Sequence, residues 1–200
     1  MPKNEDARPK PWTLVQDETV FECPYFVTRS DRVRDGGGRP RHYYHVSMRN
    51  FGIAVVPIDD RGRTILVGQQ RYLLNAFTWE VVRGGGRLDM PPLESAKKEL
   101  SEETGYRAER WLQLFRASAS PGVTDEFAVG FVAWNLRQGK PHPDPDEQLV
   151  QRQVAFAEAV SMVLSGVVAD LASSALILSI QLKLEKGELP EDLAACLRRN

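Results

Sequence analysis

Three glutamates near the middle of the chain have the spacing that most clearly indicates chemistry. Glu99, Glu102 and Glu103 stand at positions i, i+3 and i+4, so a helix would place their carboxylates on one face. Like charges at this spacing destabilise a helix by about a few tenths of a kcal/mol per pair, and a bound cation would relieve that repulsion. Hard divalent ions such as Mg²⁺ or Mn²⁺ prefer oxygen ligands, and Mg²⁺ commonly bridges carboxylates to substrate phosphates.

A solvated acidic helix face is the alternative interpretation of the same residues. In that interpretation Lys98 pairs with Glu102 one helical turn on, and no metal is involved. The Glu-x-x-Glu-Glu pattern taken alone favours the solvated face, whereas the residues around it favour a metal site.

The segment from Gly84 to Tyr106 resembles the Nudix box, G-x5-E-x7-R-E-U-x-E-E-x-G-U, in which U is an aliphatic or similar residue. The matching positions are Gly84, Glu99-Leu100, Glu102-Glu103, Gly105 and Tyr106. A long pattern with fixed spacing is far more specific than a single glycine motif, and the resemblance extends from about Pro24 to Lys186. It implies that the metal is bound by Glu99, Glu102, Glu103 and the backbone carbonyl of Arg83, and that Glu99 and Glu103 are catalytic.

Two positions depart from the box. Its first glutamate falls on Met90, although Asp89 is adjacent and Glu94 follows one helical turn on. Its arginine, which helps to hold the catalytic carboxylates in the family, falls on Lys98, which keeps the charge but loses the planar fork. These departures leave open a second function, a Nudix-fold module that senses a nucleotide with weak or no hydrolysis. The retained glutamates favour the enzyme.

Further segments resemble the branch of the family that cleaves ADP-ribose and nucleoside diphosphate sugars. The segment Gln69–Tyr72, which precedes Trp79-Glu80 and the glycine run, resembles the Gln-x-Arg segment of that branch. In Ser120–Glu126, Pro121 lies as far beyond the box as the marker proline of that branch. A guanidinium suits a diphosphate because it offers paired donors. The resemblance implies that the substrate is bound by Arg71, Glu80, Pro121 and Glu126. The alternatives are a surface arginine at a strand end and an ordinary Pro-Gly turn.

The acidic loop 144–149 offers a candidate general base. In the same branch a glutamate of this loop can deprotonate the attacking water, and Glu147 fits best by position, with Asp146 second. An acidic, proline-rich loop that is simply exposed is the alternative interpretation.

The resemblance implies metal-dependent hydrolysis of the diphosphate bond of a nucleoside diphosphate linked to another group. ADP-ribose would yield AMP and ribose 5-phosphate, while another nucleotide sugar or a dinucleotide stays open as the substrate. The implied cofactor is Mg²⁺ or Mn²⁺, and the implied partner is this small-molecule nucleoside diphosphate derivative. The strands from Pro24 onward resemble an N-terminal region through which such enzymes form homodimers.

The elements that must position these residues follow from β-branched and aromatic runs, turn residues and helical periodicity. A helix is expected over Leu93–Thr104, entered through Pro91 and Pro92 and stopped by Gly105. Turns are expected at Asp35–Gly38 and Asp59–Gly62. The glycine run Gly84–Gly86 follows the strand expected to end at Val82. Later helices are expected over Val154–Leu164 and Asp170–Lys186, the second capped by Asp170. Strands are expected over Trp12–Val15, Thr19–Glu22, Phe26–Val33, His42–Met48, Gly52–Pro57, Thr64–Gln69, Thr78–Val82, Arg110–Ser118 and Glu126–Leu136.

This pattern indicates an α+β fold, because strands and helices do not alternate regularly. The resemblance implies a Nudix-type α/β/α sandwich with a mixed central sheet, plus an N-terminal antiparallel sheet. The expected organisation is a flexible lead over residues 1–11, an N-terminal dimerisation region over 12–49, a Nudix domain over 50–190 and a tail over 191–200.

The net charge, the cysteine spacing and the length of the longest uncharged run limit the classes of function that are expected. A formal net charge of -1 provides no global field for nucleic acid or an anionic membrane, and neither is expected as a partner. Cys23 and Cys196 stand far apart and have no metal-ligand spacing, which indicates a reducing compartment. The uncharged run 171–182 is well short of the roughly 20 residues needed to span a bilayer. A cytoplasmic location is therefore expected.

Overall fold

The structure is a computed structural model that describes residues 10–139 and 149–199. The chain forms two compact units. One unit contains the described residues up to Asn50 together with Ser120–Glu126. The other contains Phe51–Ala119 and the described residues from Phe127 onward.

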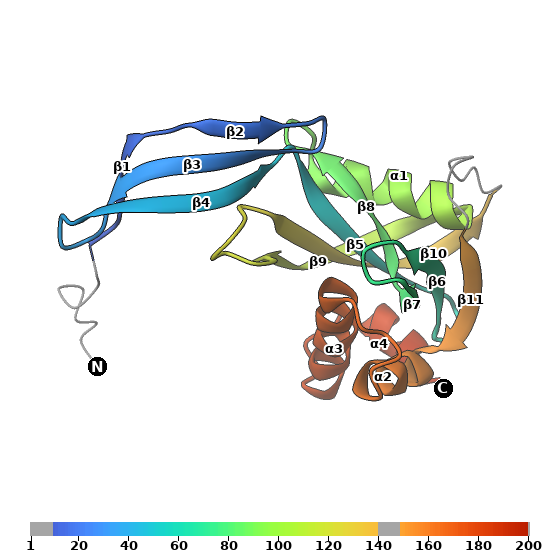
Figure 1. The fold of residues 1–200 in the computed structure, drawn as a ribbon. Coiled ribbons are helices and arrows are strands. Elements are labelled where there is room, and N and C mark those ends of the chain that lie inside the picture. Colours follow the sequence, from blue (N-terminus) through green and yellow to red (C-terminus); the bar gives the residue numbers. More distant parts are fainter. Residues whose placement is uncertain (1–9, 140–148, 200) are drawn as a thin grey trace, which may run out of the picture. The chain divides into compact units, whose positions relative to one another are not determined.

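The first unit is an antiparallel sheet (Figure 1). Its strands are β1 (Thr13–Gln16), β2 (Thr19–Glu22), β3 (Phe26–Arg34) and β4 (Pro40–Met48). The strand β3 is central, because it pairs with each of the other three. The turn expected after β3 is confirmed: Gly38 has a φ of 81°, and its N–H donates to the carbonyl of Asp35 at 2.8 Å.

The segment Ser120–Glu126 is bound to β4 and so belongs to this first unit. The N–H of Val46 donates to the carbonyl of Val123 at 2.9 Å. The N–H of Met48 donates to the Asp125 carboxylate at 2.8 Å. A segment that connects two strands of the second unit is therefore held by the first.

The second unit is built on a mixed sheet of seven strands. The order is β11-β6-β5-β10-β9, with β7 paired to β6 and β8 paired to β5. The strand β10 runs parallel to β5, whereas it runs antiparallel to β9. The strands are β5 (Asn50–Ile58), β6 (Arg63–Arg71), β7 (Ala76–Glu80), β8 (Val82–Arg87), β9 (Tyr106–Ser118), β10 (Phe127–Gln138) and β11 (Val150–Ala155).

Helices cover both faces of this sheet, with α1 on one face and α2, α3 and α4 on the other (Figure 1). Their bounds are Pro92–Thr104, Phe156–Leu164, Leu171–Glu185 and Glu191–Leu197. The helix α1 ends at Gly105, which has the left-handed φ of 75°, and α3 is capped by Asp170. The expected α/β/α sandwich with a mixed sheet is confirmed. In the described residues, no helix is long and apolar enough to cross a membrane.

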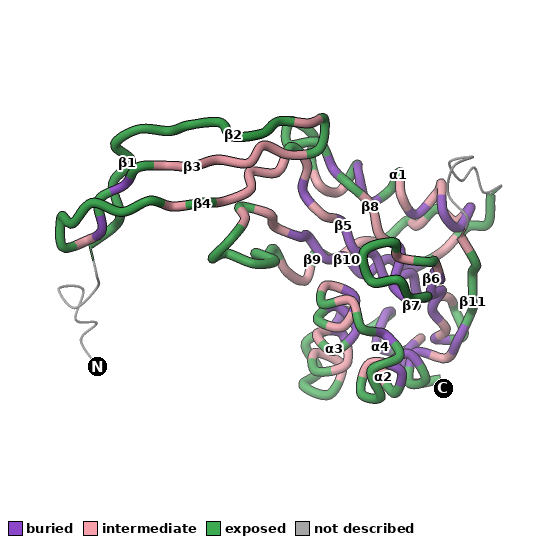
Figure 2. Tube along the Cα trace, in the orientation of Figure 1, coloured by how far each residue is buried: buried purple, intermediate pink, exposed green. Residues whose placement is uncertain are grey.

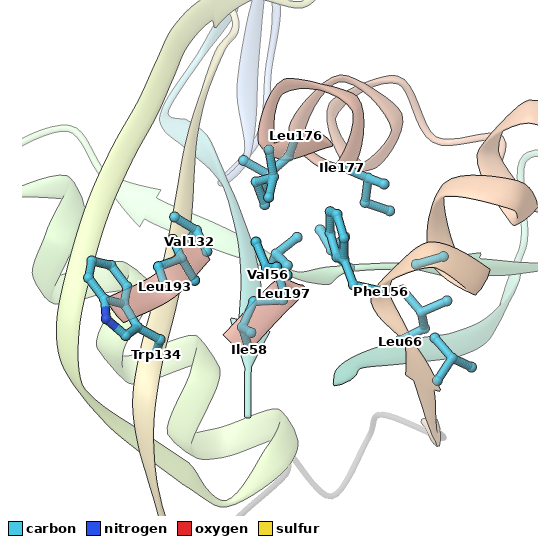
Figure 3. Close-up of a cluster of buried hydrophobic side chains, with 14 of the residues drawn as sticks. Val56, Ile58, Leu66, Val132, Trp134, Phe156, Leu176, Ile177, Leu193 and Leu197 are labelled. Carbon is cyan, nitrogen blue, oxygen red and sulfur yellow. The ribbon is translucent and has the colours of Figure 1, made fainter. Parts of the chain in front are cut away.

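The core consists of two layers because the central strands bury both of their faces (Figure 2). Ile53 and Val55 of β5 pack toward Leu100 of α1, while Ala54 and Val56 pack toward the opposite helices. The second layer joins the sheet to α2, α3 and α4 (Figure 3), and its members include Ile58, Leu66, Val132, Trp134, Phe156, Leu176, Ile177, Leu193 and Leu197. Successive side chains of a strand point to opposite faces of the sheet, so a strand that is buried on both faces contributes to both layers.

Three local expectations differ from the structure. A helix beginning at Val154 is wrong: Val154 belongs to β11 and pairs with Thr64 of β6, and the helix begins at Phe156. Pairing with β6 overrides the helical pattern here, and Val154 is buried in the strand. The glycine run Gly84–Gly86 lies inside β8, whereas the strand expected before it ends at Val82. Residues 191–197, expected within a tail, form α4.

Candidate active site

The carboxylates of Glu99 and Glu103 lie against the β8 backbone at residues 83–84. Glu103 is only 6% exposed, and its Oε2 accepts a hydrogen bond from the Arg83 N–H at 3.4 Å. Glu99 occupies the space beside Gly84, where an added Cβ would stand 2.0 Å from the Glu99 Cδ. One turn of α1 thus brings two carboxylates onto one short stretch of backbone, as the i, i+4 spacing predicts.

Glu102 has a different setting. Its carboxylate lies 3.2 Å from Nζ of Lys98, and the side chain is 40% exposed. The Lys98–Glu102 ion pair expected on a solvated face is therefore present for this glutamate. Lys98 stands where the box has arginine, so the residue at that position contacts an acidic member of the box.

The oxygen atoms present fit a divalent cation that is shared with a substrate. Among the residues described by the structure, no three His, Cys, Asp or Glu side chains gather into a complete metal site. Mg²⁺ does not require one, because it is usually held by one or two carboxylates together with waters and substrate phosphates. Glu99 and Glu103 supply hard oxygen donors of that kind beside the backbone of residues 83–84.

Met90, which occupies the first acidic position of the box, lies in an exposed segment. Met90 is 39% exposed, and the neighbouring Asp89 carboxylate forms a bidentate pair with Arg87 at 2.7 and 3.0 Å. The hydrogen bond from Arg87 holds the pKa of the Asp89 carboxyl below its ordinary value. Asp89 is thus ion-paired with Arg87 on the surface.

Arg71 and Glu80, two residues expected to bind substrate, are paired with each other across β6 and β7. The Arg71 guanidinium donates two hydrogen bonds to the Glu80 carboxylate, at 2.8 and 2.5 Å. Thr78 donates a third to the same carboxylate at 2.8 Å. The hydrogen bond to Glu80 raises the pKa of Arg71, and the charges of Asp170 and Glu103 act in the same direction. Arg71 therefore lies within electrostatic reach of Glu103.

Neighbours of the cluster include residues that sequence reasoning missed. The side-chain amide of Gln151 donates to the backbone carbonyl of Glu103 at 2.5 Å and so ties β11 to the end of α1. The Ser173 hydroxyl accepts a hydrogen bond from the Val81 N–H at 3.1 Å, which ties α3 to the residue between β7 and β8. Asp170 was expected only as a helix cap, yet its Oδ2 also lies 3.7 Å from Nε of Arg83. No sequence pattern marks these long-range contacts.

The NUDIX domain family matches residues 48–170, a span that includes the carboxylate cluster and the Arg71–Glu80 pair. The chain belongs to the NUDIX family. The expectation of a Nudix pyrophosphohydrolase is thereby confirmed.

Relatives of this Nudix chain agree with the expected branch. An ADP-ribose pyrophosphatase of Mycobacterium tuberculosis (strain ATCC 25618 / H37Rv) is 31% identical over 173 residues, which cover 83% of this chain and 81% of that protein. A GDP-mannose pyrophosphatase of Cronobacter sakazakii (strain ATCC BAA-894) is 28% identical over 185 residues, which cover 85% of this chain and 95% of that protein. The fold also matches a crystal structure of an ADP compounds hydrolase, with a TM-score of 0.80 at 20% identity, covering 91% of this chain and 99% of that one.

The remaining site residues expected for this Nudix chain stay predictions. Pro121 and Glu126 lie in the segment held by the N-terminal sheet, where Pro121 is exposed and the Glu126 N–H donates to Thr124 at 3.1 Å. Glu147 and Asp146 lie outside the described residues.

Proposed function

We propose that this Nudix chain hydrolyses the diphosphate bond of a nucleoside diphosphate linked to a sugar, with ADP-ribose or a nucleotide sugar as substrate. The products would be a nucleoside monophosphate and a sugar phosphate. The observation that carries the proposal is the convergence of Glu99 and Glu103 on the backbone at residues 83–84.

The substrate class is supported by the two relatives above. One is named for ADP-ribose and the other for GDP-mannose, so both names describe a nucleoside diphosphate joined to a sugar. The shared chemistry is the diphosphate, whereas the base and the sugar differ. We therefore assign the diphosphate bond as the target and leave its two substituents to the experiment.

Each named residue has a role in the proposed reaction. A divalent cation, Mg²⁺ or Mn²⁺, held by Glu99, Glu103, Glu102 and the Arg83 carbonyl, would supply positive charge to offset the charge that develops on the phosphate oxygens. Water attacks one phosphorus, the bond from that phosphorus to the bridging oxygen breaks, and the departing phosphate keeps the electron pair. A carboxylate accepts the proton from the water, with Glu147 proposed first and a glutamate of the box as the substitute.

The experiment is a nucleotide panel assayed with the full chain. ADP-ribose, ADP-glucose and GDP-mannose are incubated with Mg²⁺, with Mn²⁺ or with EDTA, and a phosphatase-coupled assay and chromatography quantify the products. We expect equimolar nucleoside monophosphate and sugar phosphate from at least one substrate, and loss of turnover in EDTA. Turnover that persists in EDTA would overturn the role of the cation.

A nucleotide-sensing module is the second candidate function. It is favoured by Met90 at the first acidic position of the box and by the Lys98–Glu102 ion pair, which engages one expected metal ligand. Absence of turnover on the whole panel, together with saturable binding of one nucleotide by calorimetry, would establish the sensor and reject the hydrolase.

A further inference from the structure

Arg83 presents its side chain to the side of the sheet opposite α1. Val82 packs in the apolar layer that contains Leu100 of α1, whereas Val81 packs in the layer of α2, α3 and α4. The Arg83 Nε lies 3.7 Å from the Asp170 carboxylate at the start of α3, which places the guanidinium on that same second side. Meanwhile the Arg83 backbone N–H contacts Glu103. Arg83 therefore contacts Glu103 of the carboxylate cluster through its backbone and Asp170, at the start of α3, through its side chain.

The Arg83 guanidinium is not satisfied by the residues around it. Within the described part of the chain, its Nη1 is buried and has no hydrogen-bond partner. The nearest carboxylate belongs to Asp170, whose Oδ2 already accepts from the Ser173 N–H at 2.7 Å and from the Ser173 hydroxyl at 2.6 Å. The 3.7 Å separation from the Arg83 Nε is too long for a hydrogen bond. A buried guanidinium donor without an acceptor is unfavourable, so an additional acceptor is expected.

Arg71 provides an internal comparison. It lies within electrostatic reach of the same two acids, Asp170 and Glu103, but its fork is already engaged by both oxygens of Glu80. Of these two arginines, Arg71 has a carboxylate partner in the folded chain and Arg83 has an unfilled donor. Arg83 is thus the one of these two guanidinium groups that retains an unsatisfied donor.

We infer that Arg83 is a substrate-positioning residue whose guanidinium binds the diphosphate of the substrate. The inference rests on the proposed function for the identity of the anion. Guanidinium donors match phosphate oxygens in pairs and stay charged at any physiological pH. A cation at this place also offsets the repulsion between an incoming diphosphate and the carboxylates of Glu103 and Asp170.

The test compares Arg83→Met, which keeps much of the length but removes the charge, with Arg83→Lys, which keeps the charge but loses the fork. The matched control is Arg87→Met, an exposed arginine on the same strand. With the substrate that the wild type cleaves, we expect Arg83→Met to raise KM by about 10- to 100-fold, because a charge-assisted phosphate contact is lost. Arg83→Lys should recover part of that loss, and Arg87→Met should leave KM within about twofold.

A structural role as the counter-ion of Asp170 predicts a different result. It would lower Tm in Arg83→Met and in Asp170→Asn to a similar extent and leave KM unchanged, which would overturn the inference. Asn retains the capping function, so Asp170→Asn reports the ion pair if Arg83→Met fails to fold. In that case a fall in Tm with Asp170→Asn, together with an unchanged KM in Arg83→Lys, overturns the inference, whereas a raised KM in Arg83→Lys supports it.

Binding of ADP in EDTA separates failure of this inference from failure of the proposed function. Calorimetry should show at least about tenfold weaker binding to Arg83→Met than to the wild type. A wild type that hydrolyses nothing but binds ADP through Arg83 overturns only the proposed function. A wild type that turns over normally while Arg83→Met matches it in KM and ADP affinity overturns only the inference. No turnover and no ADP binding overturn both.

Discussion

At the scale of single residues, the site depends on where two carboxylates are held. The helix supplies the i, i+4 spacing of Glu99 and Glu103, and the β8 backbone supplies a surface without side-chain bulk at Gly84. Glu103 is buried, and the Glu99 carboxylate lies against the backbone at Gly84. We expect this placement to pre-position both carboxylates for the proposed reaction.

Replacing Glu103 with Gln should lower turnover by at least about 100-fold, because it removes a carboxylate charge from the proposed cation and water site while preserving shape. The fold should persist, since the amide oxygen can still accept from the Arg83 N–H. Steady-state kinetics on the cleaved nucleotide measures the loss. Glu94→Gln, an exposed acid on the same helix, is the matched control and should keep wild-type rates. Wild-type turnover in Glu103→Gln would contradict the site.

Gly84→Ala should lower turnover by about tenfold or more with little change in Tm. The new Cβ would stand 2.0 Å from the Glu99 Cδ and 2.3 Å from its Oε2, so the carboxylate must move. Because that group is the end of a flexible side chain, it can be displaced without disrupting the backbone, whereas misplaced catalytic groups lose much of their effect. Gly52→Ala, whose added Cβ would make only ordinary contacts at 3.5 Å, is the control. Equal loss in both variants would indicate a general effect on the sheet.

At the scale of elements, the sequence predicted the helix boundaries that depend on neighbouring residues. Proline at the entrance of α1, glycine at its end and Asp170 at the start of α3 each act within one or two turns, and the structure confirms all three. The Arg71–Glu80 pairing was not predicted, because it depends on the register between β6 and β7. Likewise the Gln151–Glu103 contact depends on β11 and α1 meeting, which no local pattern specifies.

The short helix α4 depends on contacts that its own residues do not reveal. A helix of this length is marginal in isolation and forms only when packing supports it. Here Leu193, Ala194 and Leu197 are buried in the same layer as Trp134. The indole N–H of Trp134 donates to the Asp192 carboxylate at 2.8 Å, which fixes the start of α4 to β10. The stabilising partner lies 58 residues away in sequence and cannot be read from the helix itself.

The Trp134–Asp192 hydrogen bond predicts a pH-dependent stability. The bond holds the pKa of Asp192 below its ordinary value, so its stabilisation is present above the unfolded pKa of about 3.9 and is lost as the pH falls through the lower folded pKa. Asp192→Ala should lower Tm by about 2–4 °C at pH 7, because it leaves the buried indole N–H unpaired. The gap between wild type and variant should shrink as the pH falls below about 3.9.

Calorimetry across pH 7 to 3 measures that gap. Glu191→Ala, an acid in the same helical turn, serves as the control for a general effect of charge at the start of α4. A gap for Asp192→Ala that stays constant over this range would show that the carboxylate charge does not contribute. Asp192→Asn keeps an acceptor for the indole and should recover part of the loss at pH 7.

At the scale of the whole molecule, the first unit buries very few of its own side chains. Among its described residues, Val33 is the only buried apolar side chain and Asp35 the only buried polar one. Several large apolar side chains of this unit are exposed, namely Trp12, Leu14, Val15, Val20, Phe21, Tyr25 and Tyr44. A sheet of a few strands needs an apolar face packed against another element to be stable. Exposed apolar surface of this kind marks an interaction site.

We propose that the covering element is a second copy of the chain, and the prediction is a homodimer formed through the first unit. Replacing both Leu14 and Phe21 with Glu places charges in the apolar surface, where desolvation without a partner is strongly unfavourable. Light scattering after size exclusion should then shift from the mass of two chains to that of one. The control is Leu164→Glu, an exposed apolar position at the end of α2 in the second unit, which should remain dimeric. A wild type that is monomeric at micromolar concentration would reject the dimer, and dissociation by Leu164→Glu alone would move the interface to the second unit.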